Sequence, residues 1–132
     1  MDAQIKDVMR ACAEGSDSGR LMFPQVVTKL MAAGVERYHA DLQRAEKTFY
    51  LPDGGSHVVA CDPVGTRPAE AFSPELVGRA IRAIQAGRID YKTFCRQIVD
   101  AGCVGYFVSI AGRRAVYYGR SLDSLVEPFP AP

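Results

Sequence analysis

The side chains best suited to chemistry in this 132-residue chain are its four cysteines and two histidines. Cys95 and His39 have the residue types of a nucleophile and its base, because a thiol ionises at neutral pH only beside a base or a positive charge. Cys95, however, corresponds to Val27 in an internal repeat described below, which favours core packing. No triad, no acid and base pair and no cofactor motif stands out, so no catalytic residue is assigned.

Other groupings of polar residues are also weak candidates for a site. His39, His57, Asp41 and Cys61 are metal-ligand types without the tight spacing of a metal site, and no metal is expected. The glycines of 53–55 could cradle an anion, but no helix follows them and no lysine stands beside them. We interpret that segment as a tight turn and predict no cofactor.

Charge gives little reason to expect nucleic acid as a partner. The formal net charge is +1, so no strong field of either sign is predicted. Residues 87–90 could join two helices as in a helix-turn-helix, with arginines and lysines facing phosphates. The equivalent helices of the other repeat carry only scattered basic residues, which favours an ordinary solvated face over nucleic-acid binding.

The repeat itself determines the architecture that must position these residues. Residues 23–38 align without gaps on residues 91–106, at an offset of 68, and apolar positions meet apolar positions throughout. Gly34 falls on Gly102, and both are expected just beyond a helix end with positive φ. We predict one domain over residues 1–132, with repeat halves of about 1–61 and 73–130 and a linker at 62–72.

Each half is predicted to contain two helices. Apolar residues at helical spacing from Ile5 to Cys12 indicate a first helix that stops at Gly15, and a second runs from Phe23 to Gly34. In the second half, Ser73 and Asp90 are expected to cap helices that end at Gly87 and Gly102.

Antiparallel strands should follow each pair of helices. The expected strands are 36–42, 49–51, 57–61, 106–110, 115–119 and 125–127. The fold class is therefore α+β, an internal duplication of a helix-helix-meander unit, with all helices on one face of the sheet. Two-residue turns are expected in the main hairpins.

Strand parity then assigns residues to the two faces of the sheet. Tyr38, Phe49, Tyr106 and Tyr117 are predicted to lie under the helices. The opposite face carries His39, Asp41, Thr48, Tyr50, Phe107, Ser109, Val116 and Tyr118. This face is too aromatic for plain solvent surface, unless the linker or a chain terminus covers it.

Cellular location follows from charge and cysteine patterns. No apolar run approaches the length of a membrane span, and the N-terminal segment carries charges at Asp2, Lys6 and Asp7 where a signal peptide is apolar. The cysteines lack Cys-x-x-Cys spacing and are expected to be reduced. A cytoplasmic protein without membrane contact is predicted.

Several short segments resemble a known family. Phe23–Pro24, 33–36, 50–54, 89–91 and 118–120 are similar to the YdfO/YbcV-like family of small bacterial and prophage proteins, with the resemblance running from about residue 23 to 130. Its members are labelled as proteins of unknown function and sometimes as phage envelope proteins. The resemblance supplies no catalytic residues and implies little about function.

Three functions are considered. The favoured one is a non-enzymatic binding or interaction protein whose working surface contains His39, Asp41, Tyr50, Phe107 and Tyr118 and contacts either a second copy or another protein. The alternative is a small-molecule sensor with a pocket between the halves, where His39 and Asp41 supply polar contacts. An enzyme comes third.

Overall fold

The computed structural model describes residues 1–130, which form two halves of identical element order. The first half contains α1 (Ala3–Ser18), α2 (Phe23–Ala32), β1 (Arg37–Asp41), β2 (Glu46–Tyr50) and β3 (Ser56–Ala60). The second half contains α3 (Pro74–Gln85), α4 (Tyr91–Asp100), β4 (Cys103–Ser109), β5 (Arg114–Gly119) and β6 (Ser124–Pro128). The α+β class and the duplicated helix-helix-meander unit are confirmed.

Capping residues define the helices of the second half as the sequence predicts. The Ser73 hydroxyl accepts a hydrogen bond from the Leu76 amide, and the Asp90 carboxylate accepts one from Thr93 at 2.8 Å. Gly34 and Gly102 follow α2 and α4 with φ of +85° and +92°. Both glycines therefore occupy the left-handed conformation expected of them.

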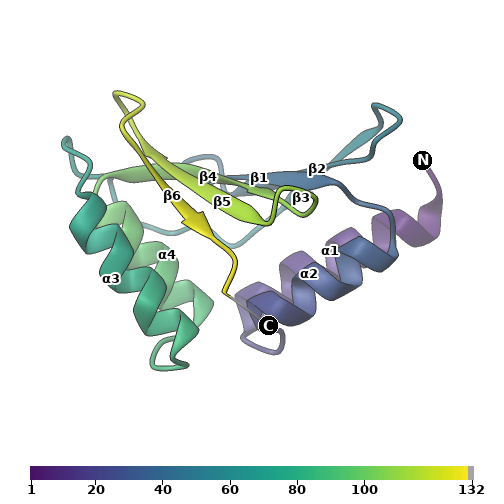
Figure 1. The fold of residues 1–132 in the computed structure, drawn as a ribbon, viewed down its shortest axis with the longest axis horizontal. Coiled ribbons are helices and arrows are strands. Elements are labelled where there is room, and N and C mark those ends of the chain that lie inside the picture. Colours follow the sequence, from purple (N-terminus) through teal and green to yellow (C-terminus); the bar gives the residue numbers. More distant parts are fainter. Residues whose placement is uncertain (131–132) are drawn as a thin grey trace.

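One six-stranded antiparallel sheet joins the halves, in the order β3-β2-β1-β4-β5-β6. The central contact is between β1 and β4, where His39 pairs with Phe107. Figure 1 shows the helices as two pairs, α1 with α2 and α3 with α4, both below the sheet. The upper face carries no helix in the part of the chain that the structure describes.

The face assignments predicted from parity are confirmed, although the predicted turns are wrong. Tyr38, Phe49, Tyr106 and Tyr117 are buried under the helices. Asp41 pairs with Glu46 and Ser109 with Arg114, so each hairpin turn has four residues instead of two. Because both lengths are even, the extra residues leave every side chain on its expected face.

The predicted end of the first helix is also wrong. α1 continues through Gly15 to Ser18 and ends at Gly19, whose φ is +76°. Gly15 is instead a packing position, since a Cβ there would lie 2.6 Å from Cγ of Leu21. Close contact with Leu21 explains a glycine that does not terminate the helix.

The linker between the halves contains no helix or strand within residues 62–72 and lies against α4. The Ala69 amide donates to the Val99 carbonyl, and the Ser73 amide donates to the Ala101 carbonyl at 2.8 Å. Lys92 forms an ion pair with Asp62 at 3.0 Å. The linker therefore belongs to the helical layer.

None of the helices in residues 1–130 has the length and apolar character needed to cross a membrane.

Candidate functional site

The open face of the sheet carries a row of side chains that crosses every strand. Cross-strand pairing aligns one residue from each of the six strands, in the order Val58, Thr48, His39, Phe107, Val116 and Val126. We call these residues the central row. Phe107 is 43% exposed, and Val58 and Val126 are each 50% exposed. Four of the six residues are apolar, and three of these four are exposed, so the central row is a largely apolar strip on the open face.

Aromatic side chains meet at the middle of the central row. The ring centroids of His39 and Phe107 lie 4.4 Å apart, and those of His39 and Tyr118 lie 5.9 Å apart in a stacked arrangement. His39 Nε2 and Tyr118 Oη form a hydrogen bond of 2.6 Å. We call these three residues the aromatic cluster. The structure thus brings together three of the five residues predicted to form a working surface.

Gly105 explains why Tyr118 can reach His39. A Cβ on Gly105 would lie 2.5 Å from Tyr118 Oη, so the tyrosine ring lies directly over this glycine. In the first half the equivalent residue is Arg37, whose guanidinium carbon lies 4.2 Å from the ring centroid of Tyr50. Tyr50 is therefore held by Arg37, outside the aromatic cluster. The two repeats have diverged at this position.

Burial shifts the pKa values of His39 and Tyr118 in the aromatic cluster. It lowers the pKa of His39 below its usual value, against an opposing effect of the carboxylates of Asp41 and Glu46. Burial also raises the pKa of Tyr118. His39 is therefore largely neutral at pH 7, and its unprotonated ring nitrogen can accept the Tyr118 hydroxyl proton in the hydrogen bond.

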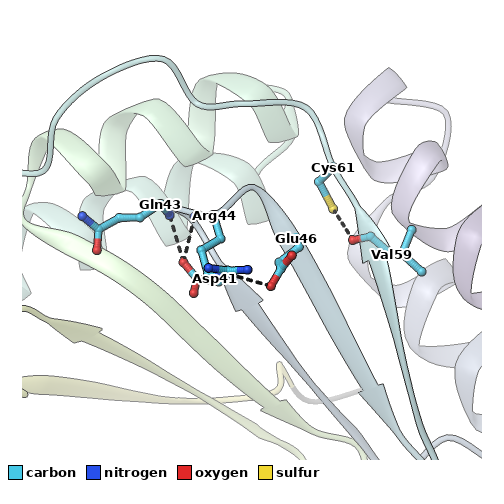
Figure 2. Close-up of polar contacts among 6 residues, drawn as sticks. All are labelled: Asp41, Gln43, Arg44, Glu46, Val59 and Cys61. Atoms are coloured by element: carbon cyan, nitrogen blue, oxygen red, sulfur yellow. Dashed lines mark hydrogen bonds and ion pairs between the residues drawn. The ribbon is translucent and has the colours of Figure 1, made fainter.

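Asp41 has a different role from the other predicted site residues. Figure 2 shows its carboxylate turned toward the turn between β1 and β2, where Oδ1 accepts hydrogen bonds from the Gln43 and Arg44 amides. The Arg44 side chain donates to Glu46 at 2.9 Å. Asp41 therefore stabilises its own turn and contributes negative charge to one end of the open face.

Neither segment proposed as a cover reaches the open face within residues 1–130. The linker is bonded to α4 on the helical side. Near the C-terminus, Phe129 packs edge-on against Phe23 of α2, with ring centroids 5.2 Å apart. Both segments lie on the opposite side of the sheet from the aromatic cluster.

The pairing of Cys95 with His39 is not realised. Cys95 is buried under the sheet on α4, whereas His39 is on the open face. Burial raises the pKa of the Cys95 thiol to about 11, so the thiolate is scarce at neutral pH. Among the residues described, no three His, Cys, Asp or Glu side chains gather where a metal ion could bind.

Cys95→Ser is expected to lower the free energy of unfolding by about 1–3 kcal/mol, because it buries a hydroxyl without an assured partner. Cys95→Val should have a milder effect, since valine occupies the equivalent position 27. Urea denaturation measures both. Cys61 is less buried and gives an internal comparison for thiol labelling. Labelling of native Cys95 as fast as Cys61 would contradict the core assignment.

Sequence reasoning predicted a pocket between the halves but did not identify the residues that line the cavity found there. A cavity of about 940 Å³ lies between the two helix pairs and the covered face of the sheet. Its described lining includes Lys47, Tyr38 and Tyr117 but neither His39 nor Asp41. Asp41 lines a smaller cavity of about 200 Å³, together with Tyr91 and Lys92 of the second half, and the polar contacts expected from His39 and Asp41 stay a prediction. The available signal was Lys47, a lysine at a position that parity places under the helices.

Comparison with known protein families assigns no activity to this chain. Residues 67–127, which include α3 through most of β6, match the model of a family described as a protein of unknown function, DUF1398. No curated protein matches the chain.

Proposed function

We propose that this chain is a non-enzymatic interaction protein that pairs with a second copy of itself through the open face of its sheet. The observation that carries the proposal is the central row, with Phe107 43% exposed at its centre. The narrower resemblance to YdfO/YbcV-like proteins adds no activity to it. We expect the protein to act in the cytoplasm, where its free thiols stay reduced.

Aromatic composition supports a protein contact. Tyrosine and phenylalanine supply large apolar area at low entropic cost, and a tyrosine hydroxyl keeps a hydrogen bond when the ring is covered. The aromatic cluster already has this form, because the Tyr118 hydroxyl is bonded to His39. Two such faces can be covered together without leaving that hydroxyl unsatisfied.

Charge on the open face favours a second copy as the partner. One end carries Arg37 and Arg114, and because Arg37 pairs with Glu36 the sum there is 2 − 1 = +1. The other end carries Asp41 and Glu46, and because Arg44 pairs with Glu46 the sum there is 1 − 2 = −1.

A two-fold axis running across the strands, between two stacked sheets, would place the basic end of each copy over the acidic end of the other. The same operation stacks the central rows on each other. The face is therefore self-complementary in both charge and apolar character.

The double variant Phe107→Asp with Tyr118→Asp is expected to be a monomer where the wild type is a dimer, with helix content unchanged. Repulsion and buried charge would oppose pairing, while the core on the other face is untouched. Native mass spectrometry and light scattering measure the subunit count, and circular dichroism measures the helix content.

The matched control places the same two charges on exposed apolar positions elsewhere. Met31→Asp with Leu76→Asp should remain a dimer, since these residues are 52% and 48% exposed and lie on α2 and α3, on the helical side of the sheet. A monomeric wild type refutes the proposal. Loss of folding in the Phe107 and Tyr118 variant alone would assign the face to the core.

A further inference from the structure

The cavity between the helix pairs is lined by equivalent residues of the two repeats. Its lining includes Leu21 with Ile89, Val26 with Phe94, and Tyr38 with Tyr106, each pair separated by 68 residues. The cavity thus lies where the approximate symmetry axis of the molecule enters the helical layer. Lys47 breaks this symmetry, because its equivalent in the lining is Ala115.

Lys47 is a buried cation without an anionic partner. It lies on β2 between Ala40 and Val59, facing the helices, and is only 5% exposed. Within residues 1–130, no carboxylate lies within 4.0 Å of its ammonium, and the ammonium donates no hydrogen bond to the protein. Its nearest aromatic contact is Tyr91, with Nζ 4.4 Å from the ring centroid.

The hydroxyls of Tyr38 and Tyr117, like the Lys47 ammonium, have no hydrogen-bond partner within residues 1–130. Tyr91 and Tyr106 satisfy each other through a hydrogen bond of 2.6 Å. Tyr38 and Tyr117 are buried, and their hydroxyls have no hydrogen-bond partner among the described residues. No described side-chain nitrogen or oxygen is sealed off without a partner, so these hydroxyls and the Lys47 ammonium are open to solvent. Lys47 lines both this cavity and a smaller one of about 200 Å³, whose lining includes Asp17 and Glu46.

The remaining wall is largely apolar. Its hydrophobic members come from both helix pairs: Leu21, Val26, Ile81, Ile84, Ile89 and Phe94. The charged residues of the lining besides Lys47 are Arg88, Asp90 and Glu127, of which Arg88 and Asp90 are exposed. Asp90 also caps α4. The cavity therefore offers one buried positive charge at Lys47, two hydroxyl donors and an apolar wall, with the half-buried Glu127 carboxylate on the side of Tyr117.

We propose that this cavity binds a hydrophobic monocarboxylate, with the carboxylate between Lys47 and the hydroxyl of Tyr38 and the apolar body against the helices. The Lys47 Nζ lies 5.9 Å from the ring centroid of Tyr38. A single buried ammonium matches a single negative charge, and the Tyr38 hydroxyl can donate to a remaining carboxylate lone pair. An uncharged apolar ligand would leave the ammonium unpaired. The site lies on the opposite side of the sheet from the proposed subunit contact.

The test uses decanoate and 2-naphthoate as aliphatic and aromatic probes, with 1-decanol as the uncharged match for decanoate. Isothermal titration calorimetry is expected to give tighter binding of at least one carboxylate than of decanol. Lys47→Met retains the length and apolar character of the side chain and should weaken the better carboxylate by about tenfold or more, with decanol unchanged. Lys29→Met removes an exposed charge and should change neither affinity.

Amide chemical shifts locate the site independently of any variant. Carboxylate binding should shift the amides of Lys47 and Ala115 and leave that of Val58 in place, since no residue of β3 lines the cavity. The Phe107→Asp with Tyr118→Asp variant should bind the carboxylate with wild-type affinity, which separates this proposal from the proposed dimer. Equal affinity for decanoate and decanol, undiminished binding by a folded Lys47→Met, or shifts confined to the open face would each overturn the proposal.

Discussion

Gly102→Ala is expected to lower the free energy of unfolding by about 2–5 kcal/mol. The left-handed conformation of this residue, with φ of +92°, costs an alanine about 1–2 kcal/mol. The new Cβ would also lie 2.7 Å from the carbonyl carbon of Ala71 and 2.8 Å from Cα of Phe72. These are backbone atoms of the linker, so relief requires moving the chain, and such overpacking costs about 1–3 kcal/mol.

The repeat provides a matched control for this prediction. Gly34→Ala changes the equivalent glycine, with φ of +85° and no atom within 4 Å of the new Cβ. It should therefore show only the conformational cost of about 1–2 kcal/mol. Urea denaturation of both variants isolates the linker contact as the difference. Equal losses of stability would mean that the linker does not press on Gly102 in solution.

Phe49→Ala is expected to lower the free energy of unfolding by about 3–5 kcal/mol. Phe49 is 1% exposed, and its ring lies against Tyr38, with centroids 5.3 Å apart. Removing a buried phenylalanine loses its transfer free energy and leaves a void that the surrounding core only partly fills.

Phe107→Ala makes the same chemical change on the other face of the sheet. Because Phe107 is 43% exposed, its loss should lower the stability of the monomer by about 1 kcal/mol or less. Denaturation at two protein concentrations separates this effect from loss of the proposed dimer. A Phe107→Ala variant as unstable as Phe49→Ala at low concentration would show that the faces are not distinguished as described.

Much of the fold can be predicted because the same sequence patterns occur in both repeat halves. Gly34 and Gly102 mark equivalent helix ends, and alternation along each strand assigns Phe49 and Phe107 to opposite faces. Turn length was less predictable, because a two-residue turn and a four-residue turn give the same alternation. Gly15 was misassigned because its contact is with Leu21, and local sequence does not show whether a glycine ends a helix or makes room for a neighbour.

The candidate sites were harder to predict than the fold. Parity correctly places His39 and Tyr118 on one face, but their hydrogen bond depends on the missing side chain at Gly105, which only three-dimensional packing shows. An inter-half pocket was predicted with polar contacts from His39 and Asp41, and Lys47 was not among its expected residues. Lys47 belongs to a strand whose alternation indicates burial, and a buried lysine conflicts with the usual preference for apolar core residues.

The placement of Lys47 also has a consequence for stoichiometry. If two identical single-repeat chains formed this cavity, the lysine would occur twice around a true symmetry axis, and two like charges would face one space. Covalent tandem linkage removes that constraint, since position 47 can be lysine while position 115 is alanine. The cavity is consequently asymmetric, with a lysine at one of two equivalent positions and an alanine at the other. A ligand with one charged end would therefore bind once per chain and in one orientation.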